Sequence, residues 1–111
     1  MKIETQNYDN VTVIELHGDF VAEFIKPFQD ATSSIVAAGT SSIVIDMTNM
    51  GFIDSPSLEQ LLWLKDSCSQ NNLQLKIAGL DENCTKIFEI TRLDSRFDTY
   101  HEVSQAVRSF V

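Results

Sequence analysis

The side chains best suited to chemistry lie in the segment GFIDSPSLEQLLWL, residues 51–64. In this segment Asp54 and Ser55 follow an apolar run and precede Pro56, Ser57 and a leucine-rich stretch. A serine hydroxyl at such a place has two uses. It can accept a hydrogen bond from the backbone at the start of a helix, or it can carry a phosphoryl group.

The first use is that of a helix cap. If Ser55 is the N-cap, Pro56 takes the first helical position, where its fixed φ and missing N–H do no harm. The Ser55 hydroxyl would then accept from the amide of Ser57 or Leu58, and Glu59 would suit the positive end of the helix dipole. Loss of such a cap typically costs about 1 kcal/mol. This role explains Ser55 and Pro56 without any chemistry.

The second use is phosphorylation, which the same geometry would tolerate. A phosphoryl group on Ser55 brings about −1.5 to −2 charges to a helix N-terminus, where free amides and the dipole accept it. A partner that covers this surface would meet a dianion beside the Asp54 carboxylate. Modification would therefore change binding and leave stability almost unaltered, as a switch requires. Ser57 is a second candidate acceptor, although its predicted place inside the helix argues against it.

Catalytic arrangements have weak support in this sequence. A Ser/His/Asp hydrolase would combine Ser55 with His17 or His101, but the chain has no GxSxG turn. Asp54 directly precedes Ser55, which is not the position from which a triad acid orients a histidine. We therefore expect a protein that is not an enzyme.

Metal and cofactor sites are also not expected. Acids at strand ends, namely Asp19, Asp46 and Asp54, could converge, but the sequence lacks metal-ligand spacing and a glycine-rich acidic loop. It also lacks a glycine loop that would cradle a phosphate. A histidine at a strand end, such as His17, is usually an exposed polar residue. We predict neither a metal nor a cofactor.

The net charge limits the class of partner. The 111 residues hold 8 Lys and Arg against 16 Asp and Glu, a net charge of −8. Nucleic acid and anionic membrane surfaces repel such a chain. No run approaches the roughly 20 apolar residues of a membrane span, and the start MKIETQNYDN lacks the apolar part of a secretory signal. We expect a cytoplasmic protein with a protein partner, no nucleic acid and no membrane insertion.

Strands and helices alternate along the chain. Alternating or β-branched segments predict strands at 1–6, 11–18, 41–48, 73–79 and 96–101. Helical periodicity predicts helices at 24–38, 56–70, 81–93 and 102–111. In the first of these Pro27 must lie in the first turn, which places the start near residue 25 or 26, and Gly39 suits the position just after the end. This order predicts one α/β domain, residues 1–111, with a mostly parallel sheet of about five strands, an antiparallel edge and about four helices. Sites in such sheets collect where strands lead into helices, as residues 51–58 do.

The order and spacing of these segments resemble the STAS domain of bacterial anti-sigma factor antagonists. The stretch SSIVIDMTNMGFIDSPSLEQLLWL matches that family's strand ending in an acid, its FIDSxGL junction and its helix. The stretch LQLKIAGLDENCTKIFEITRLDSRFDTYHEVSQAV matches its glycine-terminated strand, its helix ending near TGL, its xFxxY strand and its final helix. The resemblance covers nearly the whole chain and implies a STAS-type fold.

The resemblance implies a regulatory cycle. In this family the unmodified antagonist binds an anti-sigma factor, often a GHKL-type serine kinase that uses ATP and Mg²⁺, and so frees the sigma factor. The kinase phosphorylates the serine of the DS pair, and a PP2C-type phosphatase reverses this step. By this resemblance Ser55 would be the phosphoacceptor, Asp54 would shape the site, and Asp46 would be a structural or site-adjacent acid.

Two residues depart from the family pattern. Ser57 replaces the glycine two positions after the serine in DSxGL, and Arg92 replaces the glycine of TGL. Glycine at the first position permits close approach by a kinase, whereas Ser57 adds a Cβ and Pro56 stiffens the segment. The alternative of a non-phosphorylated STAS scaffold therefore stays open. Examples are the cytoplasmic subunit of a lipid-transport ABC complex and a component of a signalling assembly.

The predicted partner-binding face spans Met50–Trp63. Trp63 lies about 100° from the leucine stripe of its helix, so it is either a partner anchor or a cover for the edge of the core. We expect Phe52 in the core and Met50 at its rim. The predicted members of the face are acids, serines and apolar residues: Asp46, Met50, Phe52, Asp54, Ser55, Ser57, Glu59 and Trp63.

Overall fold

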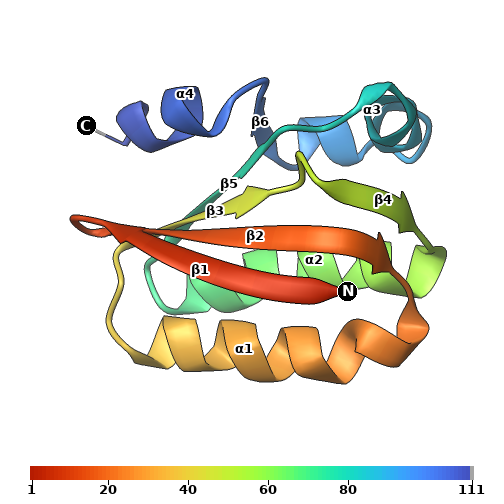
Figure 1. Ribbon diagram of the computed structural model, residues 1–111. Helices are drawn as coiled ribbons and strands as arrows, with labels where there is room; N and C mark the ends of the chain where they lie inside the picture. Colours follow the sequence, from red (N-terminus) through yellow and green to blue (C-terminus); the bar gives the residue numbers. More distant parts are fainter. Residues whose placement is uncertain (111) are drawn as a thin grey trace.

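The computed structural model describes residues 1–110, and within them six strands and four helices form the predicted α/β fold (Figure 1). The strands are β1 (Lys2–Tyr8), β2 (Val11–Phe20), β3 (Ser42–Asp46), β4 (Met50–Ile53), β5 (Gln74–Ala78) and β6 (Asp98–Tyr100). The helices are α1 (Ile25–Ala37), α2 (Ser55–Gln70), α3 (Glu82–Ile90) and α4 (Val103–Arg108), with 3-10 turns at Ala22–Phe24 and Leu93–Ser95. Val111, the end of the predicted last helix, lies outside the described residues.

The sheet has the predicted antiparallel edge and parallel interior. Its main order is β1-β2-β3-β5-β6. β1 and β2 form an antiparallel hairpin that runs from the pair Lys2↔His17 to the pair Tyr8↔Val11. β2, β3, β5 and β6 are then parallel to one another in turn. The carboxyl ends of these parallel strands therefore meet at one edge, where β3 leads toward α2.

The sequence did not predict β4, so the sheet has six strands rather than about five. β4 pairs in parallel with the end of β2, through Gly18↔Met50 and Phe20↔Ile53. This pairing is available because β2 continues to Phe20, beyond its predicted end at residue 18. A strand of four residues that contains glycine gives almost no alternation from which to predict it.

Helices cover both faces of the sheet. α1 and α2 lie side by side on one face, and α4 lies on the other (Figure 1). The larger core cluster lies between the sheet and the helices α1 and α2, and α3 contributes Cys84 and Phe88 to it. The smaller cluster lies under α4 and contains Val11, Val13, Val44, Ala78 and Ala106. This second layer explains why β2 and β3 are buried on both faces over part of their length.

The start and end of α1 follow from two residues. Pro27 lies in the first turn, as predicted, where its missing N–H breaks no helical hydrogen bond. After α1, Gly39 takes a left-handed conformation with φ of +89°, which glycine adopts without steric cost. α1 therefore ends near the predicted residue, and the chain turns back to enter β3.

Candidate functional site

The candidate site is the junction where β4 leads into α2, and its helix is capped by Asp54. The Asp54 backbone is extended, and its carboxylate Oδ1 accepts a hydrogen bond from the Ser57 amide at 3.0 Å. Ser55 is the first residue of α2, and Pro56 follows it. The prediction that Ser55 is the N-cap is therefore wrong by one residue, because Asp54 already satisfies the free amide of the first turn.

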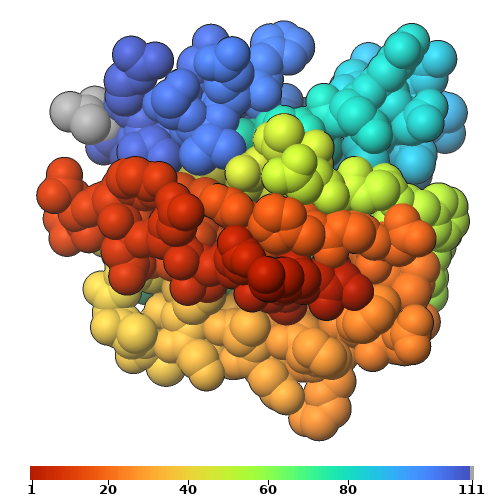
Figure 2. Space-filling model, viewed as in Figure 1, coloured from red at the N-terminus to blue at the C-terminus, as the bar shows by residue number. Residues whose placement is uncertain are grey.

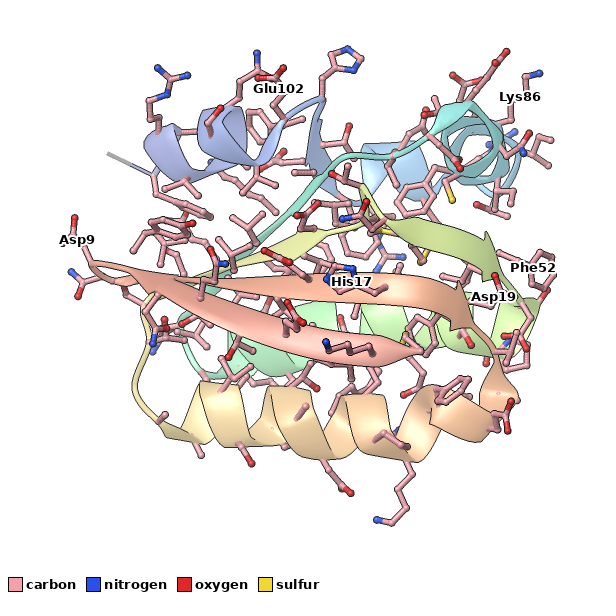
Figure 3. All side chains as sticks on the ribbon, viewed as in Figure 1. Asp9, His17, Asp19, Phe52, Lys86 and Glu102 are labelled. Atoms are coloured by element: carbon pink, nitrogen blue, oxygen red, sulfur yellow. The ribbon has the colours of Figure 1, made fainter. Side chains whose placement is uncertain are left out.

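Two carboxylates fasten this junction to the end of β2. Asp54 Oδ2 accepts from the amide of Ala22, the first residue of the 3-10 turn after β2, at 3.0 Å. Asp19 Oδ1 accepts from the amide of Phe52 at 2.9 Å, and the two residues lie next to each other in Figure 3. Each segment thus supplies one acid to the other. Sequence reasoning missed this role of Asp19, because a contact across 33 positions leaves no local signal.

The surroundings of Asp54 favour its ionised form. Its pKa is lowered mainly by the Ser57 hydroxyl and also by the amides of Ser57 and Ala22, while desolvation opposes these effects. The Ser57 Oγ is nevertheless buried without a hydrogen-bond partner among residues 1–110. It therefore acts on Asp54 as a nearby dipole whose geometry falls short of a hydrogen bond. Asp54 is a carboxylate at neutral pH.

The Ser55 side chain is exposed and is not used by the cap. Within the described part of the chain its hydroxyl makes no hydrogen bond, because Asp54 supplies the acceptor for the first turn. Pro56 and Glu59 beside it are exposed as well. The cap therefore no longer explains why a serine stands at position 55.

Three residues of the predicted partner-binding face lie inside the protein. Ser57, Met50 and Asp46 are 0%, 5% and 9% exposed, respectively. The expectation that Met50 lies at the rim and Phe52 in the core is wrong, since Phe52 is 60% exposed. The reason is β4, which directs Met50 and Ile53 inward and Phe52 outward. Met50, Ser57 and Asp46 can support the face from beneath but do not form it.

Asp46 has a structural role in the turn from β3 toward β4. Its Oδ1 accepts from the Thr48 amide at 3.0 Å and from the Thr48 hydroxyl at 2.6 Å. Asp46 is the last residue of β3, so these bonds fix the first turn after the strand. The three acids considered as metal ligands, Asp19, Asp46 and Asp54, each accept from backbone amides of this region.

Of the five remaining predicted residues, Asp54 caps α2 and the other four are exposed. Ser55, Glu59 and Trp63 follow one another at a spacing of four along α2, so they lie on one side of the helix. Trp63 is 36% exposed, so its indole both covers the core edge and offers surface. Phe52 adds a large apolar side chain from β4. We call these four residues the junction face.

One further property concerns membranes. Among residues 1–110, the structure contains no helix with both the length and the apolar character that crossing a bilayer would need.

The fold and the junction together define a class: an α/β domain with one antiparallel edge and an acid-capped helix after the central strands. The family model of the STAS domain matches residues 2–106. This chain belongs to the STAS domain family, which confirms the resemblance found in its sequence.

Relatives and solved structures agree with this assignment. The anti-sigma-B factor antagonist of Staphylococcus aureus (strain NCTC 8325 / PS 47) is 24% identical over 93 residues, which cover 84% of this chain and 86% of that protein. A putative anti-sigma factor antagonist from Thermotoga maritima superposes with a TM-score of 0.90 at 18% identity, over 96% of this chain and 92% of its own. The phosphorylated form of the Bacillus cell fate determinant SpoIIAA superposes with a TM-score of 0.78 at 12% identity, over 99% and 100%.

Proposed function

We propose that this STAS domain is a protein-binding switch of the anti-sigma factor antagonist type, controlled by phosphorylation of Ser55. One observation supports the proposal. Ser55 is exposed at the first position of α2, and Asp54 rather than Ser55 caps the helix. A serine with no structural task, at a helix N-terminus beside an exposed stripe, is suited to modification. The names of the S. aureus and T. maritima relatives support the same class.

The switch works through charge. The unmodified junction face offers Phe52 and Trp63 as apolar anchors, and Ser55 and Glu59 precede Trp63 on the same side of α2. A phosphoryl group on Ser55 would place about two further negative charges next to the Asp54 carboxylate. A partner that buries this face would have to desolvate both anions, which is costly without matching cations. The α2 cap remains in place, so the domain stays folded in both states.

The position of Ser57 removes one objection to a kinase. Its side chain is fully buried, so the Cβ that replaces the family glycine does not project from the junction face. The same burial makes Ser57 a poor phosphoacceptor, because a kinase cannot reach its hydroxyl without opening the start of α2. Pro56 remains exposed beside Ser55 and restricts how the segment bends.

We infer the partners from the family. The unmodified domain would sequester an anti-sigma factor that is itself a GHKL-type serine kinase, and a PP2C-type phosphatase would restore Ser55. This chain would act by binding in the cytoplasm and would not be an enzyme. Its net charge of −8 favours a partner whose contact surface carries Lys or Arg.

A scaffold without phosphorylation is the second candidate. The rigid Pro56 next to Ser55 favours it, because a scaffold does not have to fit a kinase active site. A neighbouring gene for a GHKL-type kinase or a PP2C phosphatase would favour the switch. Neighbouring genes for a lipid-transport ABC complex would favour the scaffold.

A capture experiment separates the two candidates. Purified wild type, Ser55→Asp and the matched control Ser69→Asp, an exposed serine near the other end of α2, would be used to capture partners from native lysate. We expect wild type and Ser69→Asp to retain a GHKL-type kinase, identified by mass spectrometry, and Ser55→Asp to lose it. The three melting temperatures should agree closely. Equal capture of scaffold components by all three proteins would contradict the switch.

A further inference from the structure

A separate cluster of titratable side chains lies on the β1–β2 hairpin, away from the junction face. Glu4, Glu15 and His17 form a group within residues 1–110 whose nearest nitrogen and oxygen atoms all lie within 4.8 Å of one another. His17 Nε2 is 3.1 Å from Glu15 Oε2 and 3.7 Å from Glu4 Oε2. Three atoms that can bind a cation thus converge on one point.

The hairpin holds these side chains on one face of the sheet. Glu4 and Glu15 are direct cross-strand partners, and His17 lies two residues beyond Glu15. Ile14 and Leu16, which alternate with them, are fully buried on the opposite face and fix this part of β2. β1 crosses the surface of the molecule between α1 and α4 (Figure 2), and His17 lies near the middle of β2 (Figure 3).

The cluster contains more hydrogen-bond acceptor atoms than the nearby donors can satisfy. Lys2 Nζ pairs with Glu4 Oε1 at 2.8 Å, which leaves Glu4 Oε2 facing the histidine. A proton on His17 Nε2 can be donated to Glu15 Oε2 at 3.1 Å, but the contact of 3.7 Å to Glu4 is too long for a second hydrogen bond. A single cation between the three atoms would satisfy all of them.

The spacing matches a small tetrahedral ion. Zinc binds histidine nitrogen and carboxylate oxygen at about 2.0–2.2 Å, so neighbouring ligands of a tetrahedral site lie roughly 3.3–3.5 Å apart. Two of the three separations between the ligand atoms, 3.1 and 3.7 Å, lie on either side of this value, and the third is within 4.8 Å. We propose that Glu4, Glu15 and His17 form a binding site for Zn²⁺ or a similar divalent transition metal, with water as the fourth ligand.

The chemistry of the ligands and their surroundings selects this class of ion. An imidazole with two carboxylates suits zinc better than Ca²⁺ or Mg²⁺, which prefer ligands that are all oxygen. Asp46 is the register partner of Glu15 in β3 and adds negative charge on the same face. The ligand side chains are 21–42% exposed, so an ion can reach them from solvent. The bound ion would link the edge strand β1 to β2.

Calorimetry with Zn²⁺ tests the proposal on the whole chain. Protein freed of metal would be titrated with zinc chloride in a buffer that does not bind zinc. We expect one saturable site in wild type and an affinity at least about tenfold lower in His17→Gln. The matched control is His101→Gln, which removes the only other histidine of the sequence, is exposed, and should bind as wild type does. Burial raises the pKa of both Cys68 and Cys84 to about 11, so these thiols compete poorly.

A second variant and a second readout make the outcome decisive. Glu4→Gln keeps the size of an edge side chain and should also weaken zinc binding, with an unchanged circular dichroism spectrum. The ring signals of His17, but not those of His101, should shift in a ¹H–¹⁵N spectrum when zinc is added. Absence of saturable binding in wild type, or equal loss in the two histidine variants, would overturn the proposal.

Discussion

Two side chains stand where the family pattern has glycine, and the fold accommodates them in different ways. Ser57 lies in the first turn of α2 and is fully buried. Arg92 lies between α3 and the following 3-10 turn, is exposed, and has φ of 63°. A side chain at position 57 must fit into the interior, whereas a side chain at position 92 must be compatible with a left-handed backbone conformation. The same missing glycine therefore has a different physical meaning at each place.

The two sites show two different costs, one of packing a side chain and one of backbone conformation. The Ser57 side chain fits into the interior, but its hydroxyl finds no partner there, which costs free energy. The Arg92 side chain meets no such constraint, but an L-residue in the left-handed region costs about 1–2 kcal/mol. Variants at the two sites, and at the cap that holds the first of them, can break or sharpen this comparison.

The largest effect is expected at Asp54, which organises the junction around Ser57. Asp54→Ala removes the cap of α2 and the bond to the Ala22 amide together, so the melting temperature should fall by several degrees. The matched control is Ser55→Ala, which should change the free energy of unfolding by less than about 0.5 kcal/mol because its hydroxyl is not used. Thermal unfolding followed by circular dichroism checks both. Equal losses of stability in the two variants would mean that Ser55 caps the helix.

The Asp54 contribution should also depend on pH. Because the folded state lowers the pKa of this carboxyl, the stabilisation is fully present above the ordinary aspartate value of about 3.9. It is lost as the pH falls through the lower folded-state pKa. Asp54→Asn retains a neutral acceptor and should flatten this part of the stability profile. Denaturant unfolding of both proteins across the acid range measures the difference.

A smaller effect of the opposite sign is expected at Ser57. Ser57→Ala removes a buried hydroxyl without a partner and introduces a better helix former, so the protein should gain up to about 1 kcal/mol. Ser57→Gly should lose this gain, since glycine in a helix costs roughly 0.5–1 kcal/mol relative to alanine. Urea unfolding of the three proteins gives the ranking. A destabilised Ser57→Ala would mean that the hydroxyl stabilises Asp54 more than burial penalises it.

The sequence predicted those features that depend on local pattern. Alternation and helical periodicity predicted the α/β order, and Pro27 and Gly39 predicted the ends of α1. The cap was missed because aspartate and serine are almost equally good N-caps. Asp54 and Ser55 are neighbours, so local preference cannot choose between them, and the distant Ala22 amide favours Asp54.

The other misses also depend on distant pairing. β4 exists because β2 extends far enough to pair with it, and the directions of Met50 and Phe52 follow from that pairing. The Glu4–Glu15–His17 cluster requires the register of the hairpin, which brings the first of these residues beside the other two. Neither feature has a signature within a short window of sequence.

The smallest effect is expected at Arg92, where the comparison is tested by conformation alone. Arg92→Gly removes the cost of the left-handed backbone, about 1–2 kcal/mol, but gives the unfolded chain more freedom, roughly 0.5–1 kcal/mol. A net gain of about 0.5–1 kcal/mol should therefore appear in urea unfolding.

The matched control for this site is Arg92→Ala. It removes the same long side chain and positive charge but keeps a Cβ at φ of 63°, so it should give no gain. If Arg92→Ala stabilised the protein as much as Arg92→Gly, the side chain rather than the backbone would be the source of strain. The family glycine at this position would then be explained by the room that a side chain needs, as at position 57. The two sites would share one physical cause.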